Sequence, residues 1–164
     1  MHMGTSYKLA HRRGGKVIWE SDWLHNSLSD QGEIELLATY FRSQAQRTTL
    51  YGRLYGAGFI PDDATLAAPV ATEVSGSGYA PVSWTVGDTD FAAPVQVGTG
   101  TKVGTTTSTT KTFTATGTWT PAVNLVLATS TDNSGKLVAS VPLSTTRTLV
   151  NTDTLDVSVA VGLD

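Results

Sequence analysis

The segment that ends the chain constrains the fold most, because it alternates with the two-residue period of a β-strand. From position 154 to 163 every second residue is apolar, and the residues between them are small or polar. The predicted inward set is Leu155, Val157, Val159, Val161 and Leu163, and the predicted outward set is Thr154, Asp156, Ser158 and Ala160. A shift of one residue would exchange the two faces, so the pattern predicts a strand with a well-defined register.

Other strands precede this one at fairly regular spacing. The further candidates are 16–20, 48–55, 79–86, 111–116, 124–129 and 136–143. The sequence Thr-Asp-Asn-Ser-Gly at 131–135 is typical of a hairpin turn. Segment 123–128 is almost entirely apolar, which predicts a strand that is covered on both faces or lies at an interface. These features predict a mostly β protein built as an antiparallel sandwich.

Segment 30–42 carries the period of an amphipathic helix instead. Its apolar stripe consists of Ile34, Leu37, Ala38 and Phe41, widened by Leu36 and Tyr40. Asp30 stands where a capping residue is expected, and Glu33 follows three residues later, as in a capping box. We expect this helix to pack deeply against a sheet through its stripe.

The length of 164 residues predicts a single domain with a core of its own. We place this domain at 17–164 and expect 1–16 to form an extended basic N-terminal arm. The net charge of -3 argues against binding of nucleic acid over the whole surface. The lack of cysteine excludes disulfides and thiolate sites, and no apolar run approaches the ~20 residues that span a bilayer. We expect synthesis and assembly in the cytoplasm, with no membrane partner.

The first sixteen residues carry several cations and no acidic residue. The cations outside the histidines are Lys8, Arg12, Arg13 and Lys16. Two interpretations stay open at this stage: a basic arm that becomes ordered on an acidic partner, or a solvated and frayed terminus. Trp19 and Trp23 follow, and they are either core and rim aromatics or anchors for this segment.

The sequence contains no local motif for catalysis or for a cofactor. The histidines at 2, 11 and 25 lack the spacing of metal ligands. Asp88 and Asp90 supply two carboxylates, which is too few for a hard cation without further oxygen ligands. The glycines of Gly-Ser-Gly at 76–78 are expected to serve a tight bend, because no helix follows. We therefore expect a protein that is not an enzyme and needs no cofactor, with a small hydrolase as a third interpretation.

A string of short motifs runs through most of 16–164. In chain order they are Asn-Ser-Leu-Ser-Asp-Gln-Gly-Glu at 26–33, Leu-Leu-Ala-Thr-Tyr-Phe-Arg at 36–42, Leu-Tyr-Gly-Arg-Leu-Tyr at 50–55, Asp-Ala-Thr-Leu at 63–66, Gly-Ser-Gly-Tyr-Ala at 76–80, Lys-Thr-Phe-Thr-Ala-Thr-Gly at 111–117, Leu-Ala-Thr-Ser-Thr-Asp-Asn-Ser-Gly-Lys-Leu at 127–137 and Leu-Ser-Thr-Thr-Arg-Thr-Leu at 143–149. Their order resembles a family of virion structural proteins of tailed bacteriophages. The segment 1–16 departs most from the resemblance.

The resemblance implies a jelly-roll-like or β-tulip-like sandwich with one N-terminal helix, as in capsid decoration (cement) proteins. It implies that the protein binds the phage major capsid protein on the outside of the head and stabilises the head. It also implies a homo-oligomer, expected to be a trimer, at the capsid surface of the virion. Repetition over a shell multiplies modest affinities, so each contact can be weak.

Under this hypothesis the residues expected to contact the partner are Lys8, Arg12, Arg13, Lys16, Trp19 and Trp23. Deletion of 1–16 is then expected to weaken capsid binding and to leave the domain folded.

The alternative function is that of a phage tail or tail-fibre component that recognises a host surface carbohydrate. Its sugar-stacking residues would be Tyr51, Tyr55, Trp84 and Trp119, for which core and interface positions are the other interpretation. Arg53 lies between two of these tyrosines on one face of a predicted strand, which favours a stacked contact at the surface.

Overall fold

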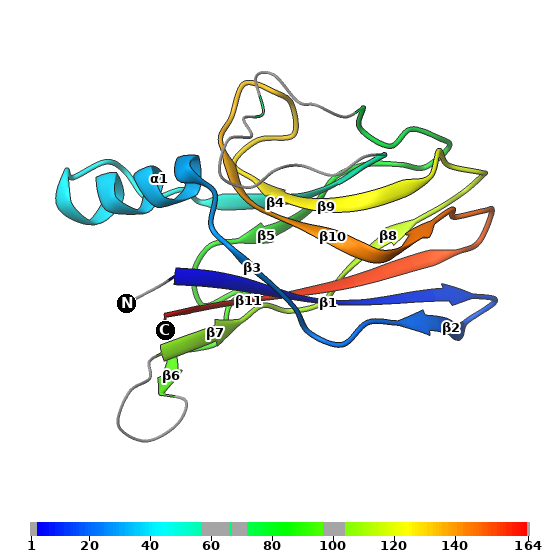
Figure 1. Ribbon diagram of the computed structural model, residues 1–164, viewed down its shortest axis with the longest axis horizontal. Coiled ribbons are helices and arrows are strands. Elements are labelled where there is room, and N and C mark those ends of the chain that lie inside the picture. Colours follow the sequence, from blue (N-terminus) through cyan, green and yellow to red (C-terminus); the bar gives the residue numbers. More distant parts are fainter. Residues whose placement is uncertain (1–2, 57–65, 67–71, 97–103, 164) are drawn as a thin grey trace.

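The computed structural model describes residues 3–56, 66, 72–96 and 104–163. Two antiparallel β-sheets are stacked face to face, and one helix projects from one end of the stack (Figure 1). The predicted mostly β sandwich with one helix is thereby confirmed. The elements are β1 (Met3–Arg13), β2 (Lys16–Glu20), β3 (Leu24–Ser27), α1 (Asp30–Phe41), β4 (Thr49–Tyr55), β5 (Val82–Thr85), β6 (Val95–Gln96), β7 (Gly104–Thr107), β8 (Lys111–Thr114), β9 (Ala122–Ala128), β10 (Leu137–Arg147) and β11 (Thr154–Leu163).

The larger sheet has seven strands and the smaller sheet has four. The larger sheet follows the order β2-β1-β11-β7-β6, with β3 also paired to β1 and β8 also paired to β11. The smaller sheet follows the order β10-β9-β4-β5. Every strand that the sequence predicted is present, although β5 begins only after Pro81, which has no N–H to donate to a ladder. Strands β1, β3, β6 and β7 were not predicted.

The core lies between the inward faces of the two sheets. The larger sheet contributes Tyr7, Leu9, Phe113, Leu155, Val157 and Val159, and the smaller sheet contributes Leu54, Trp84, Leu125, Leu127, Ala139 and Val141. The alternation at the end of the chain therefore has the predicted effect in β11, where Leu155, Val157 and Val159 are fully buried. The side chain of Leu163 lies outside the described part of the structure.

Strand β9 is buried on both faces, as its apolar sequence predicted. Leu125 and Leu127 belong to the core between the sheets. Val126 and Ala128 face the other way, into a second cluster that includes Leu66. A strand with two covered faces needs no polar side chains along its length, which explains the apolar run.

The predicted N-terminal arm is wrong, because residues 3–13 form a strand inside the larger sheet. Strand β1 pairs with β11 without interruption, from Met3 opposite Leu163 to Arg12 opposite Thr154. On its other side β1 pairs with both β2 and β3. The domain therefore includes residues 3–16, and in the described structure no boundary separates them from the residues that follow. A frayed terminus is excluded for the same residues.

The alternation of β1 explains why it enters the sheet. Thr5, Tyr7, Leu9 and His11 point inward and are buried, whereas Lys8 is exposed. This is the two-residue period of a half-buried strand, interrupted by no proline.

The turn from β1 to β2 requires glycine. Gly14 and Gly15 have φ angles of 55° and 78°, and Arg13 pairs with Lys16 across them. Two-residue hairpin loops with positive φ at both positions match the twist of the strands, and glycine adopts them without steric cost. The same two glycines that interrupt the predicted arm thus form a hairpin.

Helix α1 occupies nearly the predicted range, but its predicted cap and packing are wrong. Ser29, not Asp30, caps the helix: its Oγ accepts a hydrogen bond of 3.1 Å from the Gly32 amide. Gly32 is the one buried residue of α1, and a Cβ at this position would lie 2.3 Å from the Val138 carbonyl oxygen of β10. The helix contacts the sandwich closely at its first turn, so the apolar stripe does not pack deeply against a sheet.

The position of β1 predicts the effect of a core substitution. Leu9→Ala removes a fully buried side chain and should lower the free energy of unfolding by about 2–5 kcal/mol. Lys8→Ala, the neighbouring outward position, should change it little, because the Lys8–Glu20 ion pair is exposed to solvent. Urea unfolding of the two variants beside the parent measures both effects. Equal, small effects would show that β1 is an arm and not a core strand.

Candidate functional site

The six residues predicted to contact a partner all lie on or beside the β1–β2 hairpin. Lys8, Arg12 and Arg13 belong to β1, Lys16 and Trp19 belong to β2, and Trp23 immediately precedes β3. The structure brings them to one side of the larger sheet, where β2 and β3 pair with the same strand. It does not place them on a separate arm.

Most of the predicted cations are neutralised within the chain. Lys8 Nζ lies 2.8 Å from Glu20 Oε1, and Arg12 Nε lies 2.8 Å from Asp156 Oδ2. Arg13 binds Asp153. Lys16 forms no ion pair with any residue that the structure describes. The predicted basic surface therefore keeps one cation that is free for a partner.

The β2 segment instead exposes apolar side chains beside this cation. Val17, Ile18 and Trp23 are among the exposed large hydrophobic residues of the described structure. Trp19 is partly buried and lies under the guanidinium of Arg147, 4.2 Å from the ring centroid, so it anchors β10 to β2. We call Lys16, Val17, Ile18 and Trp23 the β2 edge surface. Strand β2 ends the order of the larger sheet, and an edge strand of this kind can pair with another chain.

His11 and Asp153 form a buried pair that resembles part of a catalytic dyad. His11 Nε2 and Asp153 Oδ2 are 3.0 Å apart, and Arg13 donates two hydrogen bonds to the same carboxylate at 2.8 and 2.9 Å. The Val150 amide donates a further hydrogen bond of 3.1 Å. His11 is buried and Asp153 is inaccessible, so no substrate can reach either group. The cluster ties β1 to the turn between β10 and β11.

Hydrogen bonding controls the protonation of this cluster. The bond from Arg13 holds the pKa of the Asp153 carboxyl well below its usual range, and the Val150 amide and His11 act in the same direction. Asp153 is therefore a carboxylate throughout the neutral and mildly acidic range, where it keeps its contact with the half-exposed Arg13 guanidinium charged.

A second cluster surrounds Arg53. The predicted stacking of this residue on a tyrosine is present, but its predicted position at the surface is wrong, because both side chains are buried. The guanidinium binds Glu73 at 2.6 Å and donates to the Asp132 carbonyl at 2.7 Å. It also lies 5.4 Å from the centroid of the Tyr55 ring, which is itself buried. Arg53 thus joins β4 to the hairpin between β9 and β10, and its side chain is not available to a ligand.

Asp90 is likewise bound by its own chain. It accepts hydrogen bonds from Lys111 Nζ at 2.8 Å, from Thr109 Oγ1 at 2.6 Å and from the Thr85 amide at 2.7 Å. These bonds, that of Lys111 first, lower the pKa of Asp90 to about 2. Within the described residues no three His, Cys, Asp or Glu side chains are grouped to hold a metal ion. His2 lies outside those residues.

Three of the four aromatic residues named for carbohydrate stacking are buried, so this set of residues is wrong. Tyr55, Trp84 and Trp119 are almost inaccessible, and the two indoles donate hydrogen bonds to the carbonyls of Thr109 and Ser77. A buried ring that has satisfied its N–H within the chain contributes to the core and does not stack on a sugar.

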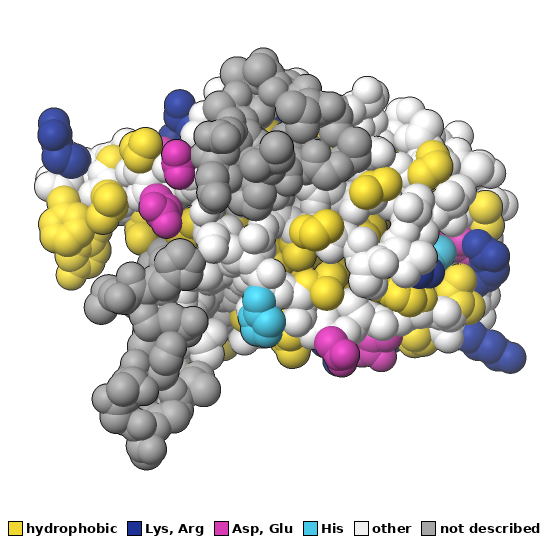
Figure 2. Space-filling model, viewed as in Figure 1, with side chains coloured by type: hydrophobic (Ala, Val, Ile, Leu, Met, Phe, Trp, Pro, Cys, Tyr) yellow, Lys and Arg dark blue, Asp and Glu magenta, His cyan; other side chains and the backbone are white. Residues whose placement is uncertain are grey.

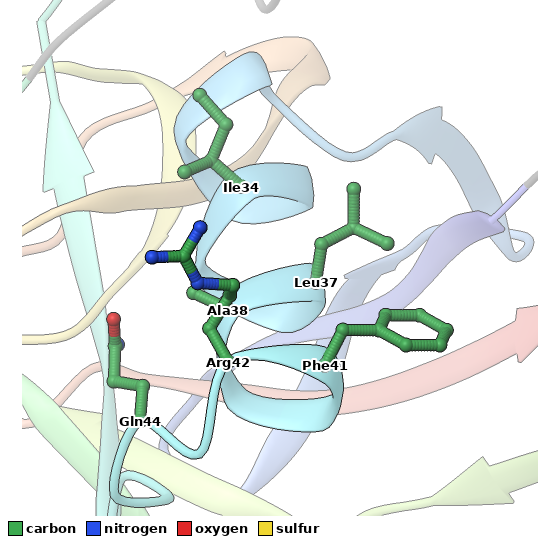
Figure 3. A pocket seen from close by; sticks show the side chains of 6 residues that line it. All are labelled: Ile34, Leu37, Ala38, Phe41, Arg42 and Gln44. Carbon is green, nitrogen blue, oxygen red and sulfur yellow. The ribbon is translucent and has the colours of Figure 1, made fainter.

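The most exposed apolar surface of the described structure lies on α1, which the sequence assigned to the core. Hydrophobic side chains gather along the projecting helix (Figure 2). An open hollow of about 630 Å³ lies beside it (Figure 3), lined by Ile34, Leu37, Ala38, Phe41, Arg42 and Gln44. The sequence gives no signal that separates a stripe facing its own core from a stripe facing another molecule.

Comparison with protein-family models and with curated proteins finds no match to this chain. In the part of the chain that the structure describes, no helix is long and apolar enough to cross a membrane. The two exposed apolar surfaces of the described structure, the β2 edge surface and α1, are therefore the candidate sites for a partner.

The buried carboxylate predicts a pH-dependent stability. Asp153→Asn should lower the free energy of unfolding at neutral pH by about 1–3 kcal/mol, because Arg13 and the Val150 amide lose a charged acceptor that is itself buried. A carboxyl whose pKa is lowered by folding stabilises the protein above its usual value of 3.8, and this contribution is lost as the pH falls. The difference between parent and variant should therefore shrink from about pH 4 downward.

Urea unfolding across a pH series measures that difference. Asp22→Asn, at an exposed position, is the matched control and should follow the parent at every pH. A gap between Asp153→Asn and the parent that stays constant down to about pH 2 would contradict the assigned role of the carboxylate.

Proposed function

We propose that this protein is a non-enzymatic structural component of a phage virion that binds the outside of the capsid and stabilises the head. The proposal rests on where the charged and the apolar side chains of the protein lie. The buried charged clusters around Asp153 and Arg53 join strands and turns, whereas the large exposed apolar residues concentrate on α1 and the β2 segment. Concentrated apolar surface of this kind marks contacts with other proteins.

The resemblance to tailed-phage virion proteins supplies the partner in this proposal. A rigid sandwich suits a cement protein because its contact surfaces keep their positions when the shell is under load. The β2 edge surface is the proposed contact with the capsid. It combines exposed Ile18 and Trp23 with the unpaired cation of Lys16 on an edge strand, and edge strands can add to a neighbouring sheet.

The carbohydrate-binding alternative receives no such support. Its named stacking residues Tyr55, Trp84 and Trp119 belong to the interior. Among the four, Tyr51 alone keeps part of its surface, and one partly buried ring is a poor platform for a sugar. A tail component is therefore an outcome to be tested and not a second proposal.

Co-sedimentation with expanded phage heads that lack this protein tests the proposal, with tails as the control. We expect saturable binding to heads and none to tails. Ile18→Asp should weaken head binding at least about tenfold, because it places a charge in the apolar contact. Val95→Asp, at a position on β6 that is 58% exposed against 49% for Ile18, should bind like the parent.

Two results would count against the proposal. Binding to tails, or to neither structure, would remove the capsid as partner. Equal losses for Ile18→Asp and Val95→Asp would remove the β2 edge surface as the contact.

A further inference from the structure

Helix α1 presents an apolar surface that the described residues of its own chain leave uncovered. Tyr40 and Phe41 are 82% and 72% exposed, and Ile34, Leu36 and Leu37 are also exposed. The described molecule places five of its nine exposed large hydrophobic residues on these twelve positions. We call Ile34, Leu37, Ala38 and Phe41 the α1 face.

The helix is attached to the sandwich mainly near its first turn. Ser29 caps it, Gly32 lies against the Val138 backbone, and the Leu137 amide donates a hydrogen bond of 2.8 Å to Gln31 Oε1. Further along, Glu35 pairs with Arg47. A helix of twelve residues is marginal in water without tertiary packing of its apolar face. We therefore expect the α1 face to pack against another surface, which the described residues of the chain do not provide.

We propose that the α1 face packs against the α1 face of a second copy of this chain, with the two helices antiparallel. This contact does not require the capsid, because both of its helices come from copies of this chain. It makes α1 a two-fold self-association surface, in place of the trimer that the resemblance implies, and leaves the β2 edge surface for the capsid.

The size and chemistry of the surface favour a second copy as its occupant. The five large exposed side chains of α1, which include Leu36 and Tyr40 beside the α1 face, expose on the order of 600 Å² of apolar area, since an aromatic side chain alone presents about 150–250 Å². A stable interface buries about 800 Å² on each partner, and interfaces between identical copies are the more apolar ones. The four residues of the α1 face carry no charge. Arg42 lines the same hollow, and it lies at the helix end that the acidic first turn of an antiparallel copy would approach.

The charges at the helix ends favour the antiparallel arrangement. Asp30 and Glu33 lie in the first turn, and Arg42 is the residue that caps the last turn. An antiparallel pair brings the acidic end of one helix beside the basic end of the other, and it also opposes the two helix dipoles. A parallel pair would bring like charges together at both ends.

The same arrangement accounts for the hollow beside the helix. When two antiparallel helices cross between Leu37 and Ala38, position 41 of one copy lies opposite position 34 of the other. Phe41 of the second copy then lies over the hollow that Ile34, Leu37 and Arg42 line (Figure 3). A two-fold contact of this kind is self-complementary, so each copy fills the hollow of the other.

Single cysteines test the contact directly, because the chain contains none of its own. Leu37→Cys should form a disulfide-linked dimer under mild oxidation, since this position meets its own copy near the crossing point. Val95→Cys is the matched control: Leu37 is 54% exposed and Val95 is 58% exposed, but Val95 lies on β6, away from the helix. The control should stay monomeric on a non-reducing gel. Equal cross-linking of both variants, or none in Leu37→Cys, would overturn the proposal.

Mixed pairs test the orientation. The Ile34→Cys and Phe41→Cys variants are mixed, and one of them carries a tag so that the three possible dimers differ in size. The mixed dimer, with position 34 linked to position 41, should form faster than either dimer of like variants. Faster formation of the two like pairs would overturn the antiparallel arrangement.

Sedimentation equilibrium in the absence of capsids tests the association itself. The parent should form dimers, and Leu37→Asp should raise the dimer dissociation constant by about 100-fold or more, because the charge would be buried. Val95→Asp should associate like the parent. The thermal unfolding midpoint of the Leu37→Asp variant should equal that of the monomeric parent, since Leu37 is exposed in a single chain. A parent that stays monomeric, or a Leu37→Asp variant that associates unchanged, would overturn the proposal whatever the result with heads.

Discussion

The structure depends on the pairing of β1 with β11. Ten consecutive pairs join the first described strand to the last one, and the inward residues of both strands fill the same side of the core. Strands β2 and β3 join the larger sheet through β1 alone, and the Arg13–Asp153 contact fastens the turn before β11 to the end of β1. Loss of this pairing would divide the larger sheet and expose Tyr7 and Leu9.

In this arrangement the basic residues of β1 are paired within the chain, and apolar residues that were expected in the core are exposed. The basic side chains of β1 complete ion pairs with carboxylates of the same sheet, so positive charge contributes more to internal order than to attraction of a partner. The exposed apolar residues of α1 and of β2 have no comparable internal role. Partner binding in this protein is accordingly expected to be driven by apolar burial, with charge setting orientation.

The sequence predicted the sandwich and the strands of the C-terminal half because their alternation is local and has few competing explanations. It failed for β1, where the cations and the Gly-Gly pair suggested an arm, although the alternation of Thr5, Tyr7, Leu9 and His11 was present. The helix was predicted, but the exposure of its apolar stripe was not. The periodicity shows that one side of the helix is apolar, and it does not show what packs against that side. Arg53 was misplaced, and Trp84 was left open between a core position and a sugar contact, because burial depends on the second sheet.

Hydrogen exchange as a function of protein concentration tests the central claim most directly, namely that the sandwich is complete in one chain and α1 is completed by a second copy. The amides of β1 and β11 should be strongly protected at every concentration, because each lies in a paired ladder. The amides of α1 should gain protection as the concentration rises. Equal protection of α1 at all concentrations, or rapid exchange in β1, would contradict the account.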